Sequence, residues 1–315
     1  MTQKIAFLFP GQGSQAVGMG RELAEKYPVA QQTFDEADAA LGFPLSKLCF
    51  EGPEDQLRLT ENTQPAIMTV SVAVARVLAE HGISPSIAAG HSLGEWSAHV
   101  VAGTLSFADG VRSVKARGRA MQIAVPPGQG AMAAILQLDA AKVAEACEEA
   151  ARETGLVVEA ANINSSGQVV ISGAAAAVEK ASELCKAKGA RRAVPLPVSA
   201  PFHCALMQPA QEEVARVLAA LSLHEPRIPV ATNVSGSIVT TAEAAKDALT
   251  RQVTGAVRWI DCEQALKSTG PDVYVEVGPG KVLCGLLKQF DAELKSLNVE
   301  NIASLEATLA ALGQP

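Results

Sequence analysis

A serine between two glycines is the clearest chemical signal in this sequence. Gly90-His91-Ser92-Leu93-Gly94 matches G-x-S-x-G, and it lies between a predicted strand ending at Ala89 and a helix that begins just after it. In this context the pattern predicts a sharp turn that exposes the Ser92 hydroxyl as a nucleophile, with the N–H of Leu93 placed to stabilise an oxyanion. The alternative on the pentapeptide alone is a glycine-rich helix start with Ser92 as its N-cap.

A serine nucleophile needs a base, and the chain offers five histidines: His81, His91, His99, His203 and His224. His91 neighbours the serine and should point away from it, and His99 lies about two turns along the same helix, too far for a contact of ~3 Å. His81 ends a predicted helix, where a cation suits the helix dipole. His203 lies on a loop where two lobes would meet, so we prefer it to His224, which lies in a polar loop.

A glycine-rich loop after the first predicted strand suggests a different chemistry. Gly11, Gly13 and Ala16 have the G-x-G-x-x-A spacing of a dinucleotide-binding loop. However, Pro10 precedes the loop, and no acidic residue closes a second strand about 20 residues later. The alternative is a tight loop beside the serine that offers the Gln12 N–H to a developing oxyanion.

The composition excludes several classes of protein. The 315 residues are 48% hydrophobic, 19% charged and 4% aromatic, which is ordinary for a globular enzyme and wrong for a disordered chain. The net charge of −7 argues against a broad nucleic-acid or anionic-membrane surface. No segment has the ~18 uninterrupted apolar residues of a membrane span, and the apolar run at 5–9 is too short for a signal peptide, so we expect a cytoplasmic protein.

The six cysteines lie at least 19 residues apart, without a C-x-x-C pair or a nearby histidine pair. We therefore expect free thiols and no metal site.

Strands alternate with helices along most of the chain, which indicates a mostly parallel α/β sheet covered on both faces. Strands are expected at 4–9, 86–90, 228–232 and 273–277, and helices at 21–41, 65–81, from about 92, and at 107–123, 204–221, 242–254 and 260–269.

A Pro/Gly stretch at 125–130 marks a change of pattern. The expected order that follows is strand 131–138, helix 139–153, strand 157–163, strand 168–172, helix 174–188 and strand 190–196. This β-α-β-β-α-β order is the ferredoxin-like arrangement. It predicts a large α/β lobe formed by residues 1–127 and 199–315, with a small lobe at 128–198 inserted into it.

The chain resembles one known family over most of its length. The matching segments are Gly11–Gln15, Gly90–Glu95, Arg117-Gly118 with Met121-Gln122, Asn162 with Gln168–Gly173, Ala200–His203, Gln252 before Val257–Trp259, and Glu276–Leu283. In this order they look like the malonyl-CoA:acyl carrier protein transacylases of fatty-acid synthesis. The resemblance also implies a hydrolase-like α/β lobe with a ferredoxin-like lobe inserted.

Catalytic roles follow from the resemblance, residue by residue. Ser92 is then the acylated nucleophile and His203 its base, and the main-chain carbonyl of Gln252 orients His203 in place of a carboxylate. The N–H groups of Gln12 and Leu93 form the oxyanion hole.

The resemblance also implies a substrate pocket. Arg117 would bind the malonyl carboxylate, for which its planar two-pronged donor is suited. Taken alone, it is one of four basic residues on the predicted helix 107–123, where a solvated face is the ordinary interpretation. Met121, Asn162 and His91 join it as substrate-binding residues. Phe202 stands where related polyketide acyltransferases carry an aromatic residue with malonyl selection, and its ring would fill the space of an α-methyl group.

The function that the resemblance implies is malonyl transfer from malonyl-CoA to the phosphopantetheine thiol of an acyl carrier protein, through a malonyl-serine. It requires no metal or redox cofactor, and a monomer is expected. The carrier is expected to be acidic, and the cationic cluster Lys186, Lys188, Arg191 and Arg192 is its candidate docking site. The alternative for this cluster is a solvated helix end.

Other functions remain open on the sequence. A serine esterase or thioesterase would use the same serine, an acyltransferase of polyketide synthesis would share the motifs, and a nucleotide-binding module would use the Gly11 loop. Trp96, a departure from the family pattern, is expected to narrow the mouth of the cleft.

Overall fold

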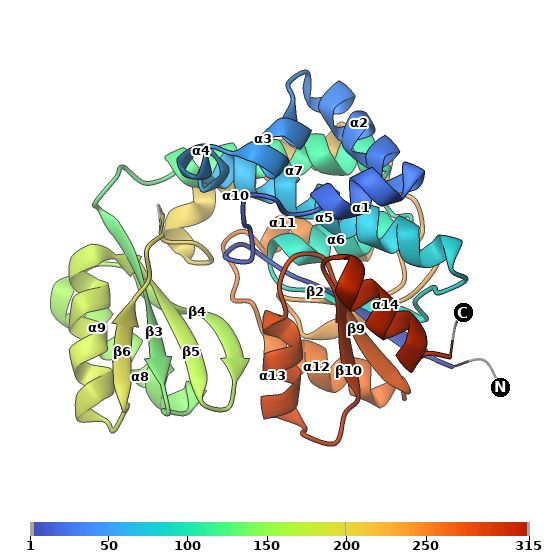
Figure 1. Cartoon of the computed structure of the whole chain (residues 1–315). Coiled ribbons are helices and arrows are strands. Elements are labelled where there is room, and N and C mark those ends of the chain that lie inside the picture. Colours follow the sequence, from blue (N-terminus) through green and yellow to red (C-terminus); the bar gives the residue numbers. More distant parts are fainter. Residues whose placement is uncertain (1–2, 199, 314–315) are drawn as a thin grey trace.

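The structure, a computed structural model, describes residues 3–198 and 200–313. A six-stranded sheet in the order β10-β9-β1-β2-β7-β8 forms its larger lobe (Figure 1). The strands are β1 (Ile5–Phe9), β2 (Ile87–Gly90), β7 (Val230–Thr232), β8 (Ser237–Val239), β9 (Val273–Val277) and β10 (Ser296–Val299). Neighbouring strands are parallel except for β8, which runs antiparallel to β7. The expected mostly parallel α/β sheet is therefore confirmed.

Strand β1 lies in the middle of this sheet and is buried along its whole length. Because side chains alternate along a strand, Phe7 and Phe9 face one apolar core while Ala6 and Leu8 face another on the opposite side. A continuous apolar strand is what a parallel sheet with two covered faces requires.

Helices cover both faces of the large sheet. They are α1 (Arg21–Lys26), α2 (Pro28–Leu41), α3 (Leu45–Glu51), α4 (Glu54–Leu57), α5 (Thr60–Glu80), α6 (Leu93–Val101), α7 (Phe107–Ile123), α10 (Gln208–Ala219), α11 (Ala242–Arg251), α12 (Trp259–Ser268), α13 (Val282–Phe290) and α14 (Ile302–Ala311), with a 3₁₀ turn at Ala205–Met207. The patterns did not indicate α3, α4, α13, α14, β8 or β10. None of the helices within residues 3–198 and 200–313 is long and apolar enough to cross a membrane.

The main differences from the expected helices lie near two prolines. The single helix expected at 21–41 is broken at Tyr27, which is extended, because Pro28 occupies the first position of α2. The helix expected from residue 65 instead begins at Thr60, with Pro65 inside it. Pro65 lies in the second turn, so it removes only one intrahelical hydrogen bond, and the buried face of α5 compensates.

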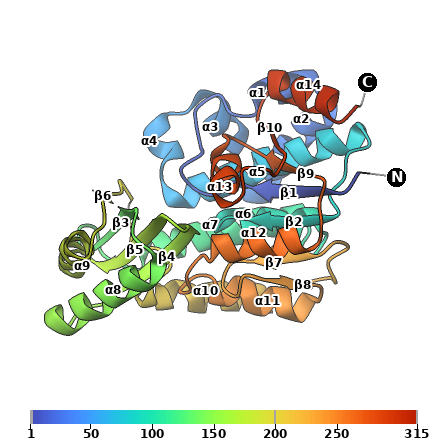
Figure 2. The ribbon, with the colours of Figure 1, turned by 90° about the horizontal axis from the view of Figure 1, so that it is seen from below.

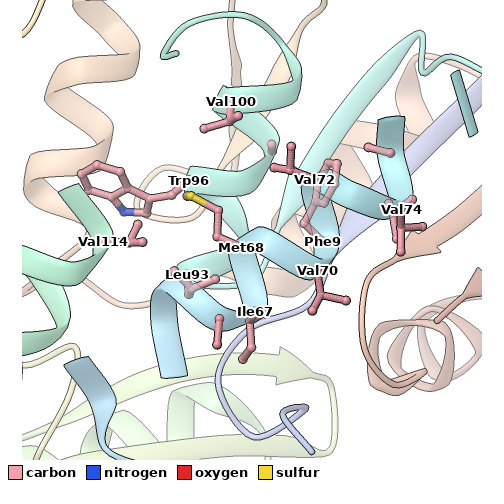
Figure 3. Close-up of a cluster of buried hydrophobic side chains, with 14 of the residues drawn as sticks. Phe9, Ile67, Met68, Val70, Val72, Val74, Leu93, Trp96, Val100 and Val114 are labelled. Atoms are coloured by element: carbon pink, nitrogen blue, oxygen red, sulfur yellow. The ribbon is translucent and has the colours of Figure 1, made fainter. Parts of the chain in front are cut away.

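Trp96 is fully buried among apolar side chains of the large lobe, including Met68, Val100 and Val114 (Figure 3). It extends from α6 into the core, so the expectation that it narrows the mouth of the cleft is wrong. Trp96 instead fills space in the apolar core, as large aromatic side chains ordinarily do.

The small lobe has its own antiparallel sheet in the order β4-β5-β3-β6. Its elements are β3 (Gly130–Leu136), α8 (Ala140–Thr154), β4 (Val158–Ser165), β5 (Gln168–Ala174), α9 (Ala175–Ala187) and β6 (Arg192–Pro195). Helices α8 and α9 pack together over a separate apolar core. The expected ferredoxin-like arrangement is confirmed.

Backbone hydrogen bonds attach the small lobe to the large one. The N–H of Val257 donates to the Ala161 carbonyl, and the N–H of Ile163 donates to the Val257 carbonyl, each at 2.8 Å. Strand β4 is the strand of the small sheet nearest the large lobe in both views (Figures 1 and 2). The division into 1–127, 128–198 and 199–315 stays a prediction, and Ser199, where its last segment begins, lies outside the described residues.

Candidate active site

Ser92 lies on a sharp turn between β2, which ends at Gly90, and α6, which begins at Leu93. Its φ of 50° is in the left-handed region, which is strained for a serine. The neighbouring glycines are required by close packing: a Cβ on Gly90 would lie 1.9 Å from the carbonyl carbon of Gly94, and a Cβ on Gly94 would lie 1.9 Å from the Phe9 oxygen. The turn therefore has the geometry that G-x-S-x-G predicts, and the serine is not a simple N-cap.

His203 is brought to Ser92 from the loop that follows the small lobe. Its Nε2 lies 2.7 Å from Ser92 Oγ, and its Nδ1 lies 2.8 Å from the main-chain oxygen of Gln252. A carbonyl oxygen only accepts, so the Nδ1 atom carries the proton and Nε2 is free to accept the hydroxyl proton of Ser92. The three groups form a nucleophile, base and orienting acceptor in series.

Burial keeps the imidazole of His203 neutral. Desolvation lowers its pKa to about 3, and the positive charge of Arg117 acts in the same direction, against the hydrogen bond to the Gln252 carbonyl. A neutral histidine at working pH is the form in which Nε2 accepts a proton.

Arg117 points from α7 to the same serine. Its Nη2 donates to Ser92 Oγ at 3.1 Å and to Gln252 Oε1 at 2.9 Å, and its Nη1 donates to Gln64 Oε1 at 2.8 Å. The residue is only 1% exposed, and its Nε has no hydrogen-bond partner among the described residues. Burial lowers the pKa of Arg117 to about 10, opposed by the charge of Glu95, so the guanidinium stays charged at neutral pH.

A network of buried hydrogen bonds holds the turn that carries Ser92. The Gln252 amide Nε2 donates to Glu95 Oε2 at 2.6 Å and to the Ser92 carbonyl at 2.9 Å. The Asn233 side chain accepts from the Ser92 N–H at 2.7 Å and donates to the Gly90 carbonyl at 2.8 Å. The Asn233 N–H donates to Glu95 Oε2 at 2.9 Å. Each of these contacts fixes the turn or the groups around it.

Burial also raises the pKa of Glu95 to about 7, although hydrogen bonds from Asn233 and Gln252 and the charge of Arg117 oppose the shift. Sequence reasoning gave no role to Glu95, Gln64 or Asn233. Two signals were available: Glu95 ends the matching segment Gly90–Glu95, and Asn233 lies directly after strand β7 at the carboxyl edge of the parallel sheet.

A cavity of about 550 Å³ opens over the serine. It is lined by Gln12, Gly13, Gln15, Arg58, His91, Ser92, Met132, Asn162, Leu196, Pro197, Val198, Phe202 and His203. The cavity thus brings together Gln12, Asn162, His91 and Phe202, and their parts in catalysis and substrate binding stay predictions. Met121 does not line it: the side chain is buried, with its sulfur 3.8 Å from the Gln64 amide nitrogen.

The glycine-rich loop after β1 lies against the turn that carries the serine. A Cβ on Gly11 would lie 2.5 Å from the His91 oxygen, so only glycine allows this approach. Gln12 Nε2 donates to Thr60 Oγ1 at 3.2 Å, which places the loop beside the start of α5. A dinucleotide-binding loop leads directly into a helix, whereas the next helix in this chain begins only at Arg21. The structure therefore does not support nucleotide binding by this loop.

His91 points away from the nucleophile, as expected. Its Nε2 lies 2.8 Å from Asn164 Oδ1 of the small lobe, and its ring lies 5.5 Å from the Trp259 ring, centroid to centroid. Because an amide oxygen accepts, Nε2 carries the proton. His91 therefore joins the two lobes at the cavity wall.

The fold gives structural positions to two other histidines and to the cysteine that follows His203. His99 is buried, with its Nδ1 3.2 Å from Thr104 Oγ1, and His81 is the C-cap of α5. Cys204 is buried, and desolvation raises the pKa of its thiol to about 11. All six cysteines are free, as expected. Within the described ranges, no three His, Cys, Asp or Glu side chains are grouped to hold a metal ion.

A strand-turn-helix serine with a neutral histidine base and a buried arginine is the arrangement of a serine-dependent acyl-transfer site in an α/β protein. The model of the acyl transferase domain family matches residues 6–307. The chain belongs to this family and is an acyltransferase.

Its curated relatives identify the branch of the family. The chain is 50% identical over 310 residues to the malonyl CoA-acyl carrier protein transacylase of Escherichia coli K12, covering 98% of this chain and 99% of the relative. Among solved structures, it matches an acyl carrier protein S-malonyltransferase from Vibrio cholerae with a TM-score of 0.93 and 49% identity, covering 97% and 99% of the two chains.

A second solved structure is a malonyl-transacylase in complex with its type II polyketide synthase acyl-carrier protein, matched with a TM-score of 0.94 and 46% identity over 98% of this chain and 99% of that one. Together the matches confirm the resemblance to malonyl-CoA:acyl carrier protein transacylases.

Proposed function

We propose that the chain transfers a malonyl group from malonyl-CoA to the phosphopantetheine thiol of an acyl carrier protein through a malonyl ester of Ser92. The observation that carries the proposal is the position of Ser92 Oγ, 2.7 Å from His203 Nε2 and 3.1 Å from Arg117 Nη2. The imidazole of His203 can remove the hydroxyl proton of Ser92, and the guanidinium of Arg117 can bind a carboxylate.

In the first half-reaction, His203 Nε2 accepts the hydroxyl proton while Ser92 Oγ forms a bond to the thioester carbonyl carbon. We assign the resulting oxyanion to the N–H groups of Gln12 and Leu93. Leu93 opens α6, and its N–H has no partner among the hydrogen bonds of the described chain. The carbon–sulfur bond then breaks, and the CoA sulfur takes the proton from His203.

The second half-reaction runs the same steps in reverse order. The carrier thiol gives its proton to His203, its sulfur attacks the malonyl ester, and Ser92 Oγ leaves and regains the proton. The oxidation state of every atom is conserved, so the proposal includes no redox cofactor, and it assigns no step to a metal.

Arg117 is the proposed carboxylate clamp. Its Nε is buried without a partner among the described residues, and its Nη2 contacts the oxygen that becomes the ester. The Nε and Nη2 edge can therefore donate two parallel hydrogen bonds to one carboxylate once Ser92 is acylated. A buried arginine that is already held by Gln64 and Gln252 loses little side-chain freedom on binding.

The partner assignments are part of the proposal. We place the acidic carrier on the cationic cluster Lys186, Lys188, Arg191 and Arg192. Lys186, Arg191 and Arg192 are exposed, while Lys188 pairs with Glu149 at 3.1 Å. From Arg192, about four residues of extended chain, or about 13 Å, lead to Leu196 on the cavity wall. A flexible prosthetic arm can bridge such a distance.

Charge reversal tests this docking site. Lys186→Glu and Arg191→Glu should raise the KM for the carrier and leave acylation by malonyl-CoA unchanged, while Lys295→Glu on the large lobe serves as the control. Equal effects on both half-reactions would argue against docking here.

Several further assignments complete the proposal. All groups of the site come from a single chain, which supports a monomer as the active unit. The free cysteines fit a reducing compartment, and we propose the cytoplasm. We propose that the malonylated carrier protein is used in fatty-acid synthesis.

The experiment is intact mass measurement after brief incubation with malonyl-CoA or acetyl-CoA. Wild type should gain one malonyl group and little acetyl, Ser92→Ala should gain neither, and Arg117→Ala should lose the preference for malonyl. Rapid release of free malonate in place of a stable malonyl-enzyme would favour a thioesterase. No labelling of wild type would overturn the proposal.

A further inference from the structure

Residues 58–64, which run from the end of α4 into the start of α5, contact the site at three points. Thr60 accepts a hydrogen bond from the Gln12 side chain, Gln64 accepts one from Arg117, and Arg58 lines the cavity above Ser92. The first two contacts support groups already described. Arg58 has no role in the chemistry at the serine, so its place at the cavity needs a separate explanation.

Arg58 is an exposed cationic side chain on the wall of this cavity. Among the described lining residues it is the only arginine or lysine, and its side chain is 68% exposed. Its Nη2 donates to Glu54 Oε1 at 2.6 Å, an i,i+4 pair in which Glu54 is also well exposed. An exposed pair of this kind contributes little to stability, so the guanidinium can exchange its carboxylate partner for another anion at small cost.

The substrate in the proposed function is anionic at both ends. Its malonyl carboxylate belongs at Arg117, which is 1% exposed and donates a hydrogen bond to Ser92 Oγ, and its thioester carbon belongs at Ser92. The pantetheine arm must then run outward through the cavity, whose wall includes the exposed side chain of Arg58. The far end of that arm carries phosphate in CoA and in a carrier protein alike.

We propose that Arg58 binds the phosphate at the outer end of the pantetheine arm. This inference rests on the proposed function and adds a second anion contact to the same substrate. A guanidinium suits the task because two of its N–H groups can bind two phosphate oxygens side by side. Glu54 competes for the same donor, so it weakens the contact and favours release of CoA after acylation.

The test compares three acyl donors that differ only beyond the pantetheine: malonyl-CoA, malonyl-dephospho-CoA and malonyl-pantetheine. Arg58→Gln should raise the KM for malonyl-CoA about 5- to 10-fold with kcat within about twofold, and leave malonyl-pantetheine unaffected. Dephospho-CoA, which keeps the diphosphate, should follow CoA. Glu54→Gln should lower the KM for both CoA donors.

Arg152→Gln is the matched control, because Arg152 forms an exposed i,i+4 pair with Glu148 on α8 and does not line the cavity. The two sources of phosphate are then distinguished by measuring transfer from malonyl-Ser92 to phosphopantetheine and to pantetheine. If Arg58 contacts the phosphate of CoA and of the carrier arm alike, Arg58→Gln should raise the KM for phosphopantetheine and leave the KM for pantetheine unchanged.

Unchanged KM values for malonyl-CoA in Arg58→Gln, with wild type still malonylated at Ser92, would overturn this inference and leave the proposed function standing. An equal rise for malonyl-pantetheine would also overturn it. Failure of wild type to form malonyl-Ser92 from any donor would instead overturn the proposed function.

Discussion

Gln252 binds both partners of the nucleophile: its side-chain oxygen accepts from Arg117 Nη2 at 2.9 Å, and its main-chain oxygen holds His203 Nδ1 at 2.8 Å. The two contacts use different atoms of one residue, so mutation can separate them. A side-chain substitution removes one of the two supports of Arg117, together with the amide contacts to Glu95 and the Ser92 carbonyl, and leaves the carbonyl that orients the base.

Gln252→Ala should therefore impair malonyl transfer more than acetyl transfer. The buried bond to a charged group contributes about 1.5–3 kcal/mol, which corresponds to about a 10- to 100-fold loss in kcat/KM for malonyl-CoA. Measurement of kcat/KM for both thioesters checks this, with His203→Ala as the control that should lose both activities. An equal loss for malonyl and acetyl would mean that the side chain supports the base or the fold instead of the clamp.

The low pKa of His203 makes a prediction about pH. Because burial holds this pKa at about 3, the base is already neutral at pH 5, and the rate of acylation should not fall with a midpoint near the usual histidine value of about 6.5. Single-turnover acylation between pH 5 and 9 tests this.

Glu95 is the group beside the serine whose pKa lies in this range, since burial raises its pKa to about 7. The pH series on Glu95→Gln separates the two groups. A midpoint that disappears in this variant belongs to Glu95, whereas a midpoint near 6.5 that survives would contradict the assignment to a neutral, buried His203.

The sequence predicted the reacting residues better than their supports. Ser92 was found because its flanking glycines and its strand-turn-helix context form a local pattern, and His203 was preferred because it lies on a loop between the lobes. Glu95, Gln64 and Asn233 gave no comparable signal. Each is a buried polar residue whose partners come from distant segments, such as Gln252 for Glu95, and no periodicity predicts such pairs.

The same reason explains the errors in the fold. A helix was expected only from residue 65, on the periodicity of its apolar residues, but the buried face of α5 extends the helix back to Thr60. That extension brings Gln64 under Arg117, a contact that no local pattern contains. Trp96 was placed at the cleft from its position after the serine, whereas its face of α6 packs into the core.

A buried carboxyl remote from the serine should make stability depend on pH. Glu263 accepts from Trp259 Nε1 at 2.9 Å, and burial raises its pKa to about 8 from an unfolded value near 4.5. The folded state therefore favours the protonated form: the stabilisation is fully present below about pH 4.5 and is lost as pH rises through about 8.

Glu263→Gln keeps an oxygen for the Trp259 N–H and cannot ionise. Its Tm should exceed that of wild type by a few degrees at pH 8.5, and the difference should vanish near pH 4.5. Thermal unfolding of both proteins across this range checks the sign. A lower Tm for the variant at pH 8.5 would show that the ionised carboxylate is stabilised by groups other than Trp259.

Phe202 should control the size of the acyl group. Its ring lines the cavity beside His203, and it is 8% exposed, so it has little room to move away from an α-methyl substituent. Phe202→Ala should raise the ratio of methylmalonyl to malonyl acylation by about 10-fold or more, since one methyl group in an apolar pocket is worth about 1–3 kcal/mol. Met132→Ala enlarges another wall of the same cavity and is the matched control. If both variants raise the ratio equally, added volume alone explains the effect, and the position of the ring next to the base has no special part in selecting the substrate.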